Sequence, residues 1–129
     1  MFAGAALTLF VGWTVMTNFR ERRRQARLAS TRSCLSQRDF IDQCELAGVD
    51  GAVAAFVWRK MQPYYFKPLT PSPGDRPVGE FRIDGGDLSD MVSDFEKAFG
   101  RRWKGQWVGS DDPTLLEFMQ GLVASTEAE

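Results

Sequence analysis

Acidic side chains gather in one short stretch of this sequence and are its first candidates for chemistry. Residues 84–100 read DGGDLSDMVSDFEKAFG, and the acids of interest are Asp87, Asp90, Asp94 and Glu96. Paired carboxylates can act as general acid and base, but only in a pocket that moves their pKa values apart. These acids alternate with apolar residues, which places them on solvent faces. We therefore interpret them as a docking surface for a basic protein partner.

Histidine is absent from the 129 residues, and the chain has two cysteines, Cys34 and Cys44. Without imidazole, the sequence lacks the commonest general base and every Ser–His or Cys–His nucleophile. Two cysteines are too few for a zinc site, and in a reducing compartment we expect free thiols. The sequence therefore predicts no catalytic residue, no metal site and no cofactor.

The acidic stretch also has the clearest helical pattern in the chain. Its apolar residues recur at spacings of three, four and seven, and so form one stripe of a helix. They are Leu88, Met91, Val92, Phe95 and Phe99. Asp84 is a suitable N-cap, and Gly100 is a typical helix stop. We predict a helix between these two residues, with acids on its opposite face.

Three other helices are predicted around it. Residues 39–46 form a short one, and residues 52–61 follow Asp50 as their N-cap. The last helix continues to about residue 122, with Asp112 as its cap and Pro113 in its first turn.

Two connecting segments complete the predicted domain. Residues 62–81 contain five of the six prolines, so they form a long loop that aromatic residues hold to the core. Residues 101–109 form a loop or short turn, and we expect Trp103 and Trp107 to insert into the core.

The first 19 residues contain no charged side chain. As a helix rising about 1.5 Å per residue, they would cover roughly the hydrocarbon thickness of a bilayer. A secretory signal would have positive charge before the apolar run, and a core helix would have a polar face. An interfacial helix would carry its basic residues along one side. We therefore predict a transmembrane helix at residues 1–19.

Five arginines follow this stretch and predict its orientation. They belong to a basic juxtamembrane connector at residues 20–37, where anionic lipid headgroups would be their partners. They are Arg20, Arg22, Arg23, Arg24 and Arg27. Because Lys and Arg beside a span stay cytoplasmic, we expect a single-pass protein of the inner (cytoplasmic) membrane. Its N-terminus would lie outside and its domain in the cytoplasm.

The remainder of the chain carries the opposite charge. Beyond Arg27 there are 11 Lys or Arg and 16 Asp or Glu, a surplus of five negative charges. An acidic domain binds nucleic acid poorly and suits a basic protein surface. We therefore expect a protein partner and no nucleic acid.

The helix predicted at residues 84–100 resembles the second helix of acyl carrier proteins. In that family an Asp-Ser-Leu motif opens a helix that ends in an acidic segment and a Phe, and Glu96-Lys97-Ala98-Phe99 matches this ending. The likeness covers about residues 50–122. More specifically, the sequence is similar to an uncharacterised bacterial family whose helix also has a Gly-Asp-rich start. The resemblance implies a small helical bundle, which we place at 38–123. With the transmembrane helix before it and a frayed tail at 124–129, we expect an all-α fold.

One departure decides what this resemblance implies for function. The family's carrier serine would stand fourteen positions before Phe99, where this sequence has Gly85, which has no hydroxyl to esterify. Ser89 is nearby, but it lies a full turn inside the helix and ten positions from Phe99. In carrier proteins the acidic face of this helix docks on basic patches of partner enzymes, and that property would remain.

The sequence thus predicts a membrane-anchored, non-catalytic protein-binding module that docks a basic partner through one acidic helix. Two alternatives stay open. The first is a functional acyl or peptidyl carrier protein modified at Ser89. The second is an immunity-type or regulatory membrane protein that sequesters a toxin or an enzyme.

Overall fold

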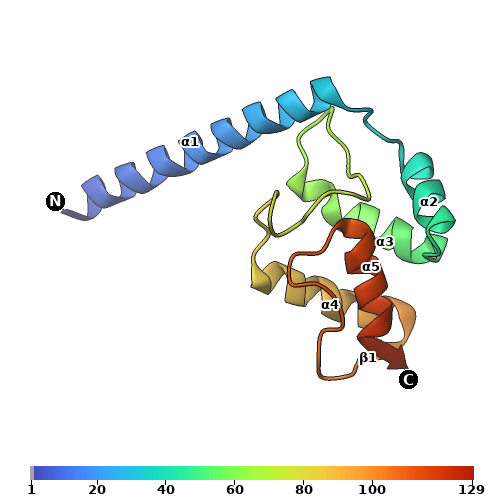
Figure 1. Cartoon of the computed structure of the whole chain (residues 1–129). Helices are drawn as coiled ribbons and strands as arrows, with labels where there is room; N and C mark the ends of the chain where they lie inside the picture. Colours follow the sequence, from blue (N-terminus) through green and yellow to red (C-terminus); the bar gives the residue numbers. More distant parts are fainter. Residues whose placement is uncertain (1) are drawn as a thin grey trace. The chain divides into compact units, whose positions relative to one another are not determined.

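The computed structural model describes the backbone of residues 2–129 and the side chains of residues 16–129. The chain divides into two compact units. The first contains residues up to Cys34 and the segment Tyr65–Thr70, and the second contains Leu35–Tyr64 and Pro71–Glu129. Most of the described chain is helical (Figure 1).

The first unit is built on helix α1 (Phe2–Thr31) and the segment 65–70. Gln25 joins the two, and its side chain is fully buried. Its amide nitrogen donates to Glu21 (2.9 Å), and its carbonyl oxygen accepts from the backbone N–H of Phe66 (2.6 Å). A polar side chain of the arginine-rich stretch therefore holds the two parts of this unit together.

No helix in the described part of the chain is long and apolar enough to cross a bilayer. The prediction of a transmembrane helix at residues 1–19 is therefore wrong. The predictions of a single-pass protein, of an inner-membrane location and of an outer N-terminus rested on it and are wrong with it. Much of the uncharged stretch lies at residues 1–15, whose side chains are outside the described ones.

Most of the basic segment 20–37 is helical. Helix α1 continues through the arginines as far as Thr31, and the next helix begins at Gln37. Arginine is a good helix former, and residues 13–31 contain no Gly or Pro. An ion pair between Glu21 and Arg24 (2.7 Å), three residues apart, adds support on the helix surface.

The second unit contains the other elements of the chain. They are α2 (Gln37–Leu46), α3 (Gly51–Met61), the 3₁₀ helix η1 (Gln62–Tyr64), α4 (Gly85–Phe99), β1 (Arg101–Trp103), α5 (Leu115–Ala124) and β2 (Thr126–Ala128). The helices predicted at 39–46, 52–61 and 84–100 are confirmed, with small shifts at their ends.

Side-chain caps explain where α3 and α4 begin. Asp50 accepts a hydrogen bond from the N–H of Ala52 (2.8 Å), and Asp84 accepts one from the N–H of Asp87 (2.7 Å). Helix α4 ends at Gly100, whose φ of 60° lies in the left-handed region that glycine adopts without strain. Both predicted N-caps and the predicted stop are confirmed.

Helix α5 begins later than predicted because a different residue caps it. The Thr114 hydroxyl accepts from the N–H of Glu117 (3.2 Å), and the Glu117 carboxylate accepts from the N–H of Thr114 (3.1 Å). This reciprocal pair is a capping box. Asp112, the predicted cap, instead accepts from the N–H of Gly79 (3.1 Å) and holds the proline-rich loop.

Aromatic side chains form much of the core of the second unit. Phe56 of α3 meets Phe95 and Phe99 of α4 edge-on, with ring centroids 5.8 and 5.7 Å apart. Phe40 of α2 lies against Trp58 of α3 at 5.3 Å. Such pairs contribute about 0.5–1.5 kcal/mol each beyond their burial. Helix α5 adds fully buried side chains, namely Leu115, Met119 and Leu122.

The last six residues are not a frayed tail. Strand β2 pairs with β1 in a two-stranded antiparallel sheet, so the predicted all-α fold is wrong in this respect. Ser125 and Thr126 are buried. The Arg101 guanidinium donates to the hydroxyl and to the carbonyl oxygen of Thr126, each at 2.8 Å. Hydrogen bonds therefore order residues that were predicted from the sequence to be frayed.

Replacing Thr114 with Ala removes the hydroxyl that caps α5. We expect the free energy of unfolding to fall by about 1 kcal/mol, the usual cost of losing an N-cap. Urea unfolding followed by circular dichroism measures this change. Gln120→Ala, an exposed position on the same helix, is the control and should change stability by less than about 0.5 kcal/mol. Equal losses in the two variants would contradict the capping box.

The same cap predicts a pH dependence. Hydrogen bonds from the backbone and side chain of Thr114 lower the pKa of the Glu117 carboxyl. A carboxyl whose pKa is lower in the folded state stabilises the fold above its unfolded-state pKa, and this contribution disappears as the pH falls through the folded-state pKa. The stability difference between wild type and Glu117→Gln should therefore be largest at neutral pH and shrink on acidification. A difference that is constant with pH would argue against the assignment.

Candidate functional site

Helix α4 does not present its acids as one face. Asp87 and Asp94 contact the end of α3 and the residues after it: the Tyr64 hydroxyl donates to Asp87 (2.9 Å), and Lys60 Nζ lies 2.6 Å from the Asp94 carboxylate. Lys60 lowers the pKa of Asp94, first through this hydrogen bond and then through its charge. A cation of the same chain therefore already engages one of the predicted docking residues.

The phenol of Tyr64 lies beside the acids on this side of α4. Burial raises the pKa of its phenol to about 12, and the hydrogen bond to Asp87 and the charges of Asp84, Asp87 and Asp90 add to the effect. The phenol therefore stays protonated at neutral pH and remains a donor to Asp87.

The other two predicted docking residues have different surroundings. Asp90 is exposed to solvent. Glu96 accepts from the backbone N–H of Trp103 (3.3 Å), which follows α4 in strand β1. The structure thus separates Glu96 from the pair that contacts α3, and the docking of a partner by these four acids stays a prediction.

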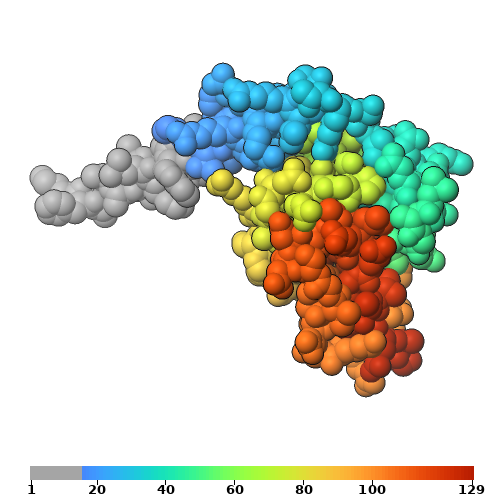
Figure 2. Space-filling model, in the orientation of Figure 1, coloured from blue at the N-terminus to red at the C-terminus, as the bar shows by residue number. Residues whose placement is uncertain are grey.

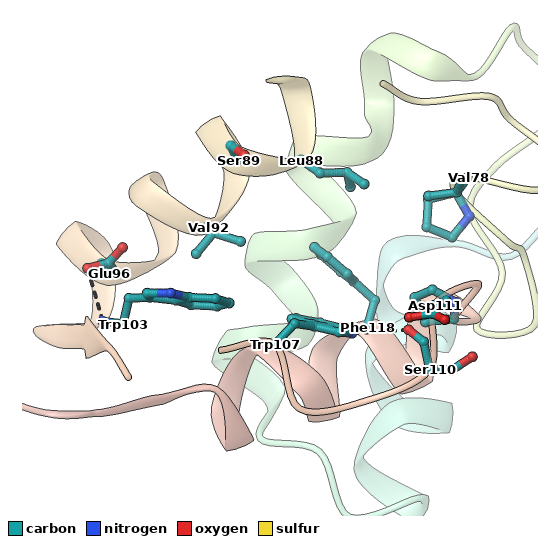
Figure 3. Close-up of a pocket in the computed structure, with 12 residues that line it drawn as sticks. Val78, Leu88, Ser89, Val92, Glu96, Trp103, Trp107, Ser110, Asp111 and Phe118 are labelled. Atoms are coloured by element: carbon teal, nitrogen blue, oxygen red, sulfur yellow. Dashed lines mark hydrogen bonds between the residues drawn. The ribbon is translucent and has the colours of Figure 1, made fainter. Parts of the chain in front are cut away.

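A groove of about 520 Å³ opens on the Glu96 side of α4 (Figure 3). Most of its lining is apolar and comes from α4, from the residues after it and from α5: Leu88, Val92, Trp103, Trp107, Pro113 and Phe118. Pro77 and Val78 of the proline-rich loop also line it. The groove is therefore built from segments that lie far apart in the sequence.

The polar lining of the groove has a definite sign. It consists of Ser89, Glu96, Ser110 and Asp111, and the groove has no Lys or Arg among its lining residues. Figure 3 shows Glu96 and Asp111 at opposite ends, with the two tryptophans between them. The groove is thus apolar along its length and acidic at both ends.

Trp107 largely determines the shape of the groove. Its ring stacks on Phe118, with centroids 5.7 Å apart, and its indole N–H donates to the carbonyl of Ser110 (3.0 Å). It also lies over Gly121 of α5, where an added Cβ would overlap its six-membered ring. Only glycine allows the ring to approach the helix this closely.

The buried Ser125 fixes the loop that carries this tryptophan. Its hydroxyl accepts from the N–H of Val108 (2.7 Å), and its carbonyl accepts from the N–H of Lys104 (2.9 Å). Farther along, Asp112 accepts a hydrogen bond from the N–H of Gly79 in the proline-rich loop. The orange and yellow surfaces of the two segments adjoin in Figure 2. The groove wall is therefore held at both of its ends.

Sequence reasoning missed this groove. It placed Trp103 and Trp107 in the core, whereas both are only half-buried and line the groove. The available signal was their setting, because two tryptophans stand in a short polar loop between Gly100 and Gly109. Large aromatic residues in such a loop are frequently found at binding surfaces.

The positions singled out by the carrier-protein resemblance lie on α4. Gly85 is its first residue, is exposed, and has room for a Cβ with no other atom within 4 Å. Ser89 is exposed one turn later and lines the groove. Among the described residues, no group of three or more His, Cys, Asp or Glu could hold a metal ion.

The arginines predicted to face lipid headgroups all belong to α1. The Arg22 guanidinium lies 4.4 Å from the centroid of the Phe66 ring, and Arg24 pairs with Glu21. The other three are exposed: Arg20, Arg23 and Arg27. Their contact with lipid stays a prediction.

Gly121→Ala tests the contact beneath Trp107. At an open helical position this change stabilises by about 1 kcal/mol. Here the methyl group would displace the indole ring, and overpacking costs about 1–3 kcal/mol, so we expect a net loss of stability in urea unfolding. The indole N–H signal of Trp107 in a ¹H–¹⁵N spectrum should also shift.

Gly85→Ala is the matched control, because a Cβ there meets open space. It should leave stability and the Trp107 signal close to those of wild type. A Gly121→Ala protein as stable as this control, with an unmoved indole signal, would contradict the close contact.

Comparison with known proteins identifies no relative of this chain: no family model, no curated protein and no solved structure matches it. The likeness to acyl carrier proteins accordingly stays a prediction from the residues of α4.

Proposed function

We propose that the second unit is a non-catalytic binding module that docks a basic protein partner. The distribution of charge carries this proposal. Residues 35–64 and 71–129 contain 16 Asp or Glu and 9 Lys or Arg, a surplus of seven negative charges. Such a surface attracts basic proteins, speeds their encounter and repels acidic partners and nucleic acids.

Helix α4 concentrates this charge. Its residues 85–96 include four acids and no Lys or Arg. Lys60 engages Asp94 and Tyr64 engages Asp87, whereas Asp90 is exposed. We therefore assign first contact with the partner's cations to Asp90 on the helix and to Glu96 at the groove.

The groove favours binding over catalysis. General acid–base work needs two carboxylates that converge on one reacting group. Glu96 and Asp111 lie at opposite ends of the groove instead (Figure 3). The chain also has no histidine to activate Ser89 or Ser110 as a nucleophile. An apolar surface with acidic ends is well suited to holding a ligand that is not transformed.

The resemblance to acyl carrier proteins is consistent with this proposal. A carrier-like domain with glycine at the start of α4 has no hydroxyl for a prosthetic group at that position. Such a domain would still dock through its acidic helix but could not carry a covalently attached group at that position. Our proposal therefore includes a carrier-like module that recognises a partner without delivering a covalently bound cargo.

Reversing the charge of Asp90 tests the docking surface. The full chain is immobilised and used to select peptides from a random library displayed on phage. We expect the selected peptides to be rich in Lys and Arg, and their affinity for Asp90→Lys to be about two- to fivefold weaker, mainly through slower association. Biolayer interferometry of the synthesised peptides measures both quantities.

Asp42→Lys is the matched control, because it makes the same change at an exposed position on α2. Reversal of Asp94 is less informative, since it would put a second cation beside Lys60 and disturb the contact with α3. Selected peptides without a basic bias, or equal weakening by Asp90→Lys and Asp42→Lys, would contradict the proposed docking surface.

A further inference from the structure

We infer that the groove beside α4 receives an amphipathic helix of the partner, with apolar side chains seated between Trp103 and Trp107 and cationic side chains at both ends. This inference rests on the proposed function and specifies the part of the partner that is recognised. It is carried by the size, lining and charge of the groove and by the fixed position of its wall.

The size and lining fit several apolar side chains rather than one. A space of about 520 Å³ is within the range of sites that bury most of a ligand, roughly 300–1,000 Å³. Leu88 and Val92 form one wall, and Trp107 on Phe118 forms another. One helical turn that presents apolar residues at spacings of three and four offers a surface of matching kind.

The negative charge at the ends of the groove favours cationic side chains of the partner. Glu96 and Asp111 lie at its two ends, and the lining includes no Lys or Arg that could neutralise them (Figure 3). A cationic side chain at either end of the bound helix would therefore meet a carboxylate. An anionic side chain there would meet like charge, which disfavours acidic partners.

A helix suits this site better than an extended strand. Addition of a strand requires a free sheet edge along the binding surface, because main-chain hydrogen bonds supply the affinity. Of the lining residues, only Trp103 belongs to a strand, and its N–H already donates to Glu96. The groove instead offers side chains, which pack against the apolar face of a helix.

The groove wall is ordered before a partner arrives. Trp107 is held by its stack on Phe118, by its hydrogen bond to Ser110 and by its contact with α5 at Gly121. A side chain that is already fixed loses little further entropy on binding. Half-buried tryptophans of this kind are frequent among the residues that contribute most to binding.

The test uses labelled peptides of about 14 residues, roughly four helical turns. One has leucines at helical spacing between lysines, a second has serines in place of the leucines, and a third has glutamines in place of the lysines. Fluorescence anisotropy with the full chain should show that the Leu–Lys peptide binds at least about tenfold more tightly than the other two. It should also shift the Trp107 indole N–H signal.

Ser89→Trp and Ser93→Trp form a matched pair of variants. Both change an exposed serine of α4, but only Ser89 lines the groove. We expect Ser89→Trp to weaken the Leu–Lys peptide about tenfold, and Ser93→Trp to leave its binding unchanged. Circular dichroism of both variants checks that the fold is retained.

The outcomes separate this inference from the proposed function. Equal binding of the Leu–Lys and Ser–Lys peptides, both weakened by Asp90→Lys, would overturn the groove and leave basic docking intact. Equal binding of the leucine peptides with and without lysines would overturn the preference for cations. Binding of none of the peptides would overturn both. Self-association that Ser89→Trp abolishes would make a second copy the occupant and overturn the assignment to a partner.

Discussion

The close approach of Trp107 to helix α5 at Gly121 is the contact on which the groove depends. It brings a large ring from a surface loop against a helix backbone, where any side chain would keep it away. The ring then stacks on Phe118 and leaves its other side for the groove. Without this contact the loop between β1 and α5 would keep the hydrogen bonds of Ser125 and Asp112 at its ends but lose its apolar contact with α5. The absence of one Cβ thus allows the ring to form one wall of the groove.

Helix α4 serves three purposes at once, and its residues divide accordingly. Met91 and Phe95 are buried in the core. Asp87 and Asp94 bind Tyr64 and Lys60, and so join α4 to the end of α3. A third set, which includes Ser89 and Glu96, faces the groove. An acid on a helix surface is therefore not by itself evidence of docking, because two of these acids make contacts within the same unit.

The sequence predicted the helices of the second unit well because their signals are local. Asp50 and Asp84 cap the residues that follow them, and Gly100 ends α4. The groove could not be predicted in this way, because it joins Val78, Val92, Trp107 and Phe118, which meet only in the folded chain. The end of the chain was misjudged for the same reason, since β2 is ordered by Arg101 and strand β1.

The two errors in predicting helix starts and ends have separate physical causes. At α5, we predicted the start from the Asp112-Pro113 pair. The structure shows that the reciprocal hydrogen bonds of Thr114 and Glu117 determine it instead. At α1, hydropathy placed the end of a membrane span at residue 19, yet arginine is a good helix former and the helix continues to Thr31. A change in polarity marks a change of environment, whereas a helix ends only where the backbone finds other hydrogen bonds.

Charge is informative in this protein only when it is counted by unit. The whole chain has a net charge of −1, which would indicate no electrostatic preference. The first unit has seven Lys or Arg and one acid, while the second has a surplus of seven negative charges. Electrostatic attraction between exposed charges extends only about one Debye length, roughly 8 Å at physiological salt. The potential at the groove is therefore set by Glu96, Asp111 and their neighbours rather than by the average of the chain, and this local field is the basis of the proposed preference for cations.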